Sequence, residues 1–392
     1  MKKILSLLLV LTLMLSLAAC GGDSGTATGE GENKVAMITD YADITDQSFN
    51  QTTWEACVKF GEATGIEVRY YKPVSDDTAG RVASAELAIA EGYNIIVMPG
   101  YAFGGTLAEI TANYPDVKFI ALDMAKGDLL ESGVALKGES YDYNPDNWNL
   151  TDYVYMDNVY CAIYQEELCG YMAGYAAVKL GYTQLGFLGG MAVPAVQRFG
   201  YGFVQGVDAA AAELNVDASV KYAYCNQFHG DADLTAVMET WYANGTQAVF
   251  ACGGSIWTSA AEAAKKYDGK IIGVDTDQAA VIDGMYGEGL TITSATKGLA
   301  PTTIDTLTDI VNNNNWAKYA GKIESLGLVS EDPASNYVQL APSTQFEEGK
   351  FTAEDYAALV KGMLDGTIQV SNDTFNQPAV TAITVEWLGN LK

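Results

Sequence analysis

The sequence predicts a doubly wound α/β protein with two lobes, and three observations lead to this prediction. Short apolar runs alternate with stretches of helical periodicity from Lys34 to about residue 300, a pattern typical of parallel strands joined by crossover helices. Each run leads into Gly, Asp or Pro. The 392 residues, 49% of them hydrophobic, are enough for two packed domains. Because the pattern occurs twice, we expect two sheets.

The expected elements follow in chain order. The strands of the first half are 35–39, 94–98 and 118–122, and those of the second half are 185–188, 248–251 and 271–274. The helices between them are expected at 50–64, 81–91, 166–180, 198–214 and 259–267. A short β-like run at 291–294 precedes a helix at 300–312, and this run is expected to return the chain between the lobes. A last helix is expected at 353–364.

The domain boundaries follow from where this pattern breaks and resumes. The segment 127–157 has little periodicity and is longer than the usual connection of about 2–6 residues, so we interpret it as an insertion or lid. We expect the first lobe at 34–157 plus about 295–325. The second lobe is expected at 158–294 plus about 326–392.

The N-terminus indicates export and anchoring. Two lysines precede an apolar run at residues 4–19, which is shorter than the roughly 20 residues needed to cross a bilayer. We expect a signal peptide at 1–19. The run ends in Leu-Ala-Ala before Cys20, which resembles a bacterial lipobox, so Cys20 is expected to carry a lipid. Residues 20–33 are rich in Gly, Ser, Thr and Glu and predict a flexible tether. The protein is therefore expected outside the cytoplasm, anchored to the cell membrane.

Composition excludes several function classes. The 22 basic and 49 acidic residues give a net charge of −27, which opposes binding to nucleic acid. The chain has a single histidine, His229, and this scarcity argues against metal sites and imidazole-based catalysis. We expect His229 at the surface or at a hinge. Neither a GxxxxGK[ST] nor a GxGxxG motif occurs. The five cysteines after Cys20 contain no CxxC pair and suit the core, with one disulfide left open. We expect no cofactor, no metal and no enzymatic activity.

Polar residues follow the expected strands at the places where a ligand would bind. In open α/β sheets, ligands lie beyond the carboxyl ends of the strands. Three of the six residues at these places are aspartates, and although any one of them can simply cap a helix or a turn, together they indicate a cleft. The six residues are Asp40, Tyr101, Asp123, Gly190, Gly254 and Asp275.

Phe49 stands just before the expected helix 50–64, where water would surround its ring unless another group covers it. Its neighbours Ser48 and Asn50 are good capping residues. Two explanations remain open for the phenylalanine. It can form a hydrophobic staple with the first turn of its own helix, or it can be an aromatic platform in the cleft.

The stretch ITDYADITDQSFNQTTWEA at 38–56 resembles the opening signature of the basic membrane protein (BMP) family. This family comprises substrate-binding lipoproteins of ABC transporters, and its best understood members are purine nucleoside receptors. Further similar stretches follow in order: FIALD (119–123), QRFGYGFVQGVDAAA (197–211), ACGGSIWTSAAEAA (251–264), IIGVDTDQ (271–278) and TSATKG (293–298). The resemblance covers about residues 34–298. It implies a type I periplasmic binding protein fold, in which two Rossmann-like lobes joined by a hinge close over a ligand.

The resemblance also implies roles for single residues. A nucleoside base would lie between one ring from each lobe, Phe49 and Trp257. Further polar groups would come from Asp40, Asn50 and Asp123 of the first lobe and from Gly254 of the second, and Asp275 and Lys297 would hold the ribose hydroxyls. Tyr101 is also expected to bind the ligand, because it follows an expected strand. The sequence departs from the family in having Trp257, where phenylalanine is usual, and in the long segment after Asp123.

We therefore expect an ABC-transporter receptor that binds a nucleoside, of the purine class, and delivers it to a permease and ATPase complex. It is expected to be a monomer. A sugar receptor of the same fold remains open, because two aromatic faces and a diol site also suit a pyranose. A ligand sensor without transport, and a secreted hydrolase with paired carboxylates such as Asp40 and Asp123, are further alternatives. The export signal disfavours a cytoplasmic repressor.

Overall fold

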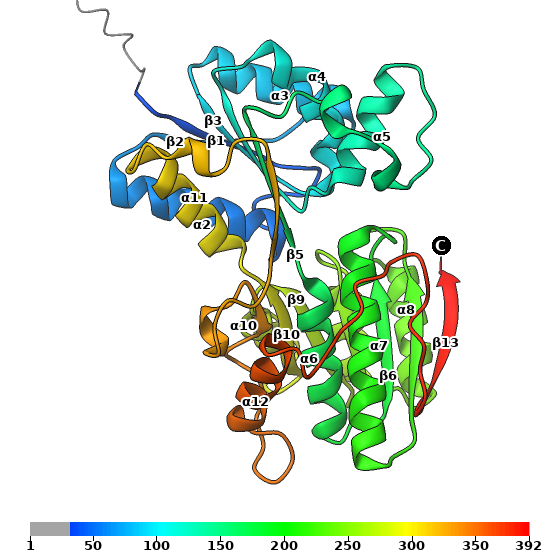
Figure 1. Ribbon diagram of the computed structural model, residues 1–392. Helices are drawn as coiled ribbons and strands as arrows, with labels where there is room; N and C mark the ends of the chain where they lie inside the picture. Colours follow the sequence, from blue (N-terminus) through cyan, green and yellow to red (C-terminus); the bar gives the residue numbers. More distant parts are fainter. Residues whose placement is uncertain (1–31, 392) are drawn as a thin grey trace, which may run out of the picture. The chain divides into compact units, whose positions relative to one another are not determined.

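The computed structural model describes residues 32–391 (Figure 1). The expected signal peptide, Cys20 and almost all of the tether therefore lie outside the described residues. From Lys34 onward the chain forms one unit. Its strands form two separate sheets, which confirms the expected α/β fold with two lobes.

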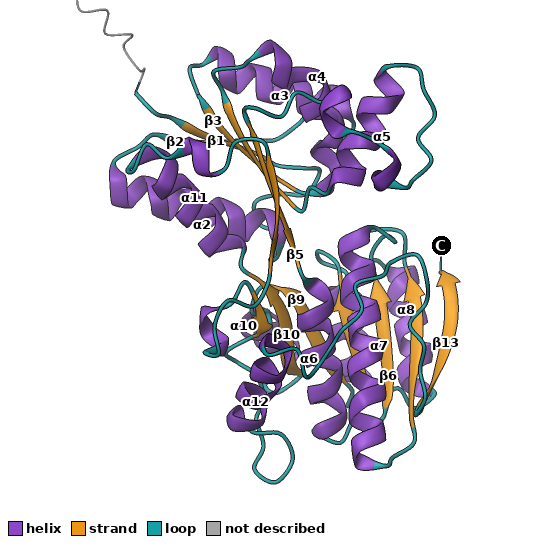
Figure 2. Ribbon diagram, viewed as in Figure 1, coloured by secondary structure: helices purple, strands orange, loops and turns teal. Residues whose placement is uncertain are grey.

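The first lobe contains a sheet in the order β11-β5-β4-β3-β1-β2, with all neighbouring strands parallel. The central strands are continuous apolar runs because helices cover both faces of the sheet (Figure 2). The strands are β1 (Val35–Ile38), β2 (Val68–Tyr71), β3 (Ile95–Pro99), β4 (Lys118–Leu122), β5 (Val159–Tyr164) and β11 (Lys322–Leu326). The helices are α2 (Phe49–Thr64), α3 (Thr78–Ala90), α4 (Gly104–Ile110), α5 (Lys126–Leu136) and α11 (Leu299–Val311).

The second lobe contains a sheet in the order β12-β10-β9-β8-β6-β7-β13. All pairs are parallel except β12 against β10. The strands are β6 (Gln184–Gly189), β7 (Ala218–Tyr224), β8 (Ala248–Cys252), β9 (Lys270–Asp275), β10 (Thr291–Lys297), β12 (Val338–Leu340) and β13 (Ile383–Asn390). The helices are α6 (Glu166–Lys179), α7 (Pro194–Leu214), α8 (Ala232–Ala243), α9 (Trp257–Tyr267), α10 (Ala279–Tyr286) and α12 (Ala353–Leu364).

The chain passes between the lobes at Gln165, at Gly298 and near Gly327, where β5, β10 and β11 end. Backbone hydrogen bonds from Gln165 to Leu326 and from Gly298 to Tyr337 hold these crossings side by side. Such connections at the ends of strands can act as a hinge between lobes. The expected return of the chain after the run at 291–294 is thus observed.

The expected lobe boundaries need correction. Residue 157 is too early, because β5 pairs with β4 and β11 in the first sheet. Residues 295–297 belong to the second lobe, because β10 pairs with β9. The proposed insertion at 127–157 also begins with α5, which is the ordinary crossover helix between β4 and β5, so only the part after Leu136 is irregular.

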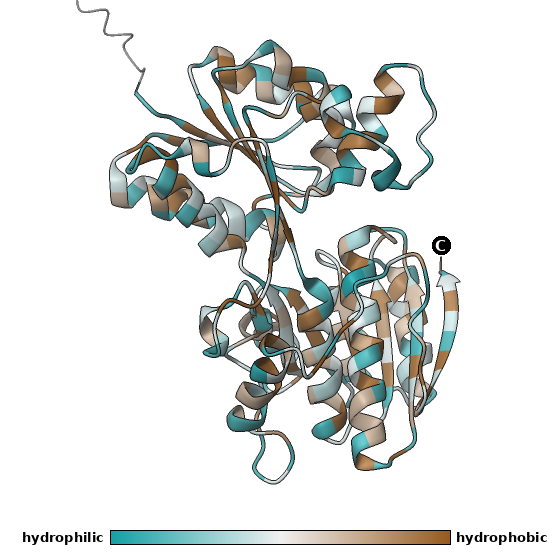
Figure 3. Cartoon of the chain, viewed as in Figure 1, coloured by the Kyte–Doolittle hydropathy of each residue, from teal (hydrophilic) through white to brown (hydrophobic). Residues whose placement is uncertain are grey.

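The interior is apolar throughout both lobes, and Figure 3 shows apolar residues concentrated on the central strands. The five cysteines after Cys20 are buried, so they act as core residues. Among the described residues, no helix is both long enough and apolar enough to cross a membrane.

Candidate functional site

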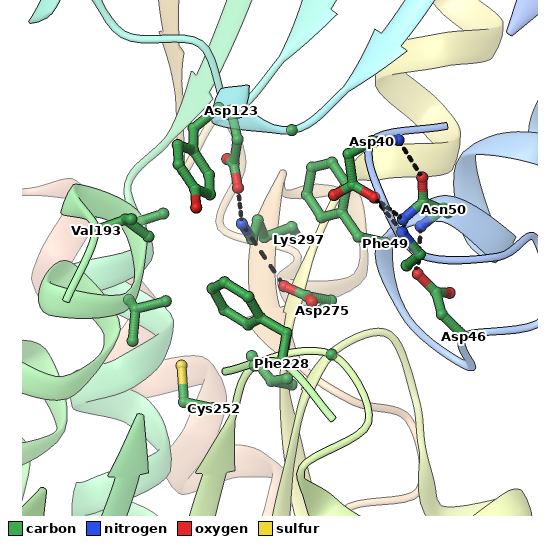
Figure 4. A pocket seen from close by; sticks show the side chains of 18 of the residues that line it. Asp40, Asp46, Phe49, Asn50, Asp123, Val193, Phe228, Cys252, Asp275 and Lys297 are labelled. Carbon is green, nitrogen blue, oxygen red and sulfur yellow. Dashed lines mark hydrogen bonds and ion pairs between the residues drawn. The ribbon is translucent and has the colours of Figure 1, made fainter. Parts of the chain in front are cut away.

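A cavity of about 380 Å³ lies where strands of both sheets end, within the roughly 300–1,000 Å³ typical of small-molecule sites. Figure 4 shows acidic, basic and aromatic side chains gathered around it. Its lining residues come from both lobes. From the first lobe they include Asp40, Tyr41, Asp46, Phe49, Asn50, Tyr101, Asp123 and Asp128, and from the second Arg198, Phe199, Phe228, His229, Cys252, Gly254, Asp275 and Lys297.

Two aspartates at the ends of parallel strands have the same unusual backbone conformation. Asp123 follows β4 with φ 58°, and Asp275 ends β9 with φ 66°. Such left-handed residues cost on the order of 1 kcal/mol and concentrate at functional sites, and aspartate is among the few non-glycine residues that tolerate the conformation. The chain therefore turns sharply at both strand ends, and both residues border the cavity.

Asp40 and Asn50 form one polar end of the cavity. The Oδ1 of Asp40 accepts hydrogen bonds from the backbone N–H groups of Tyr41 and Ala42 and from Nδ2 of Asn50. The side chain of Asn50 in turn accepts from the backbone N–H of Asp40 at 3.3 Å. Burial raises the pKa of Asp40 to about 6, although these hydrogen bonds lower it. The pair is thus preorganised for a ligand edge that donates and accepts hydrogen bonds.

Lys297 forms the opposite polar end. Its side chain is 3% exposed, and its Nζ forms ion pairs with Asp123, with Glu166 at 3.4 Å and with Asp275 at 3.6 Å. Burial by itself lowers the pKa of this lysine, but the three carboxylates outweigh it and hold the pKa above its ordinary value. The ammonium therefore stays charged. Three rings face it, at ring-centre distances of 4.9 Å (Phe49), 5.4 Å (Phe199) and 5.7 Å (Tyr164).

Glu166 connects this lysine to a second buried cation. The carboxylate is fully buried at the start of α6 and accepts a 2.5 Å hydrogen bond from Nε of Arg198 on α7. Burial raises the pKa of Glu166, while Arg198 and Lys297 oppose the shift. The sequence pattern does not indicate Glu166 as a site residue, because the strand before it, β5, is not among the expected strands. Arg198 lies in the QRFGYGF motif, for which the family resemblance implies no ligand contact.

The prediction that Trp257 faces the ligand is corrected by the structure. Its indole is 2% exposed and packs edge-on against Tyr286 at 6.4 Å, inside the hydrophobic core between α9 and α10. Besides Phe199, the phenylalanine of the second lobe that borders the cavity is Phe228. It stacks against Tyr41 of the first lobe, with ring centres 6.1 Å apart and planes inclined by 27°.

The other expected residues all border the cavity: Asp40, Phe49, Asn50, Tyr101, Asp123, Gly254, Asp275 and Lys297. Phe228 had a detectable signal, because it lies in the loop after β7. Since β7 is not among the expected strands, the residues that follow it are not among the six expected at strand ends. His229, its exposed neighbour, lies at the edge of the same cavity.

The lobes touch each other around the cavity. Ser48 of the first lobe donates a 2.6 Å hydrogen bond to Oδ2 of Asp275, and Gln278 donates to the backbone oxygen of Gln47 at 3.0 Å. The hydroxyl of Tyr101 contacts the sulfur of Met191 at 3.4 Å. Each of these contacts joins one lobe to the other, so the cavity is shaped by closure.

Residues 33–331 match the profile of the Bmp family, described as ABC transporter substrate-binding protein PnrA-like. The chain belongs to this family. Substrate binding for an ABC transporter is therefore its role, and permease and ATPase subunits are the partners that the family implies. The relatives include the ABC transporter nucleoside-binding protein BmpA of Lactococcus lactis subsp. cremoris, 24% identical over 67% of this chain and 70% of that protein. Basic membrane protein B of Borreliella afzelii is 25% identical over 84% and 87%.

Solved structures confirm the fold. A solute-binding protein from Aeropyrum pernix K1 matches with a TM-score of 0.62 over 88% of each chain at 19% identity. Another from Conexibacter woesei matches with a TM-score of 0.62 over 87% of this chain and 99% of that chain at 21% identity. These family members and structural neighbours are solute-binding proteins rather than enzymes.

Proposed function

We propose that this receptor binds a nucleoside, with purine nucleosides preferred, in the cavity between its lobes. The observation that carries the proposal is the combination of two rings from opposite lobes, Phe49 and Phe228, with polar groups at both ends of the cavity. A nucleoside has the matching layout, because a flat apolar base is joined to a sugar with several hydroxyl groups.

Each contact has a physical rationale. Stacking on an aromatic ring contributes about 0.5–1.5 kcal/mol beyond the buried area. A hydrogen bond to a charged group contributes about 1.5–3 kcal/mol, and Asp275 with Lys297 supplies such groups for a ribose diol. Asp40 and Asn50 supply acceptors and donors for the edge of the base. The relative named as a nucleoside-binding protein supports this assignment.

Calorimetric titration tests the proposal against a sugar receptor of the same fold. We expect adenosine, guanosine or inosine to bind more tightly than cytidine, and ribose and galactose to bind weakly. The reason is that a free sugar cannot fill both the ring-lined region and the polar ends. Tight binding of galactose without binding of any nucleoside would overturn the proposal. Mass spectrometry of molecules released from denatured protein gives an independent identification.

We further propose that Cys20 carries the lipid that anchors the receptor outside the cytoplasm. Relatives support this, including an uncharacterized lipoprotein of Pyrococcus abyssi that is 25% identical over 57% of this chain and 50% of that protein. Replacement Cys20→Ser should move the protein from the detergent phase to the aqueous phase in Triton X-114 partitioning. Retention of the variant in the detergent phase would contradict the anchor.

A further inference from the structure

Arg198 and Asp128 border the same cavity from opposite lobes. Asp128 lies in the first turn of α5, and its Oδ2 accepts a 2.8 Å hydrogen bond from the backbone N–H of Ala125. Arg198 lies near the start of α7, its side chain is 13% exposed, and its Nε donates to Glu166. Both side chains are therefore held in place by contacts within their own lobe.

Each of the two side chains has unused hydrogen-bonding capacity. A guanidinium has five N–H donors, and among the described residues only the Nε of Arg198 has a hydrogen-bond partner. The Oδ1 of Asp128 likewise has no partner within the described part of the chain. Among the described residues, Arg198 and Asp128 form no ion pair with each other, but the charge of Arg198 acts on the Asp128 carboxyl. Burial raises the pKa of Asp128 to about 7, and Arg198 acts in the opposite direction.

The charges around this pair select the kind of group that can bridge it. Glu166 already pairs with Arg198, and Asp123 already pairs with Lys297. The carboxylates near the pair therefore leave no surplus positive charge for an anionic ligand group. A buried Oδ1 of Asp123 also lacks a hydrogen-bond partner. A phosphate or carboxylate would be repelled, whereas a neutral group that both accepts and donates hydrogen bonds would satisfy both sides.

We propose that Arg198 and Asp128 form a second polar subsite that takes a neutral hydroxyl of the ligand across the cleft. This inference rests on the proposed nucleoside function, and the hydroxyl is then the 5′-hydroxyl of the ribose. Asp275 and Lys297 take the 2′,3′-diol, so the 5′-hydroxyl is the ribose hydroxyl that still needs a partner. Asp128, five residues after Asp123 in the chain, borders the same cavity. The subsite accepts nucleosides and rejects their 5′-phosphates.

Calorimetry with guanosine and adenosine, their 5′-deoxy analogues and their 5′-monophosphates tests the subsite. We expect the 5′-deoxy analogues to bind the unmodified protein at least tenfold more weakly than the parent nucleosides. The monophosphates should bind at least 100-fold more weakly.

Two variants assign this preference to the pair. Asp128→Asn keeps an acceptor for the N–H of Ala125, and Arg198→Lys keeps a cation beside Glu166, so both should fold. Each variant should bind the parent nucleoside at least tenfold more weakly than the unmodified protein does. Its affinity for the 5′-deoxy analogue should be almost unchanged. Glu131→Gln, on an exposed position of the same helix as Asp128, is the control and should change neither affinity.

The outcomes separate the two proposals. If parent and 5′-deoxy nucleosides bind the unmodified protein equally well, the subsite is wrong and the nucleoside function stands. If Asp128→Asn and Arg198→Lys weaken both ligands equally, the pair has only a structural role and the subsite is again wrong. Tight binding of a monophosphate also overturns it. If no nucleoside binds at all, both proposals fall.

Discussion

Ser48 shows how a single side chain here serves a contact that its local sequence does not suggest. It occupies the N-cap position of α2, but its hydroxyl makes no capping hydrogen bond and instead reaches Asp275 in the other lobe. Asp46 takes over the capping, since its carboxylate accepts from the backbone N–H groups of Ser48, Asn50 and Gln51. The SFN motif thus combines a helix start with an inter-lobe contact.

Substitutions at the ring and the aspartate test the assignment of the site. We expect Phe228→Ala and Asp275→Asn each to weaken nucleoside binding at least tenfold, because the first removes a stacking surface and the second a charged acceptor. Calorimetry measures both effects. Trp257→Phe is the control, since the indole lies in the core, and its affinity should stay within twofold of the unmodified protein. If Trp257→Phe weakened binding more than Phe228→Ala and Asp275→Asn do, the tryptophan would contact the ligand and the assignment would be wrong.

The buried carboxyls predict how stability depends on pH. Burial raises the pKa of Asp40 to about 6 and the pKa values of Asp128 and Glu167 to about 7, above the unfolded values near 4. The folded state therefore holds protons that the unfolded state releases. Their stabilising contribution is complete below about pH 4 and is lost as the pH rises through 6 and 7.

Urea denaturation of the ligand-free protein between pH 5 and pH 8 measures this effect. The free energy of unfolding should decrease as the pH rises, by up to about 1.4 kcal/mol per pH unit for each carboxyl that remains protonated only in the folded state. Asp128→Asn should make the decrease shallower. A free energy of unfolding that increases over this range would contradict the assignment.

Among the helices, α6 and α7 pack unusually closely, and this positions Glu166 beside Arg198. A Cβ on Gly202 would lie 2.1 Å from the backbone oxygen of Glu167, and one on Gly206 would lie 2.0 Å from that of Tyr171. Both contacts are with backbone, which cannot rotate away. Glycine is therefore required at these positions of α7 for the two helices to approach each other.

Replacing Gly202 by alanine should force the helices apart. We expect Gly202→Ala to lower the free energy of unfolding by about 1–3 kcal/mol, as overpacking does, and to weaken ligand binding because Arg198 moves. Urea denaturation and calorimetry measure the two effects. Gly284→Ala in α10 is the matched control, because a Cβ there meets nothing within 4 Å, and alanine should be neutral or stabilising by up to about 1 kcal/mol. Equal effects of both variants would refute the packing argument.

For the whole molecule, closure depends on contacts that the lobes make with each other as well as with the ligand. A ligand shifts an equilibrium between open and closed forms only through contacts that are better in the closed form. The hydrogen bond from Ser48 to Asp275 biases that equilibrium before any ligand arrives.

Removing this hydroxyl should favour separated lobes without harming α2, because the side chain makes no cap. We expect Ser48→Ala to increase the radius of gyration of the ligand-free protein in small-angle X-ray scattering. The affinity should fall several-fold, since a smaller fraction of molecules is competent to bind. An unchanged radius of gyration together with unchanged affinity would show that the contact does not control closure.

Much of the fold was predictable because buried parallel strands are continuous apolar runs, and every strand and helix that we expected is present. Two of the strands that escaped prediction have weaker patterns. β7 alternates buried and partly buried residues and contains Lys221, and β13 is largely exposed. Missing β7 had a functional consequence, because Phe228 in the loop behind it was then not considered for the site.

The sequence by itself determined the alternation of strands and helices and the acidic residues at strand ends, because these depend on neighbours in the chain. Tertiary structure decided which rings border the cavity and which charges pair. Trp257 and Phe228 are both aromatic residues close to strand ends, but packing of α9 against α10 buries the first and leaves the second at the cavity. Lys297, Asp123 and Glu166 meet only because three chain crossings bring distant segments together at the hinge.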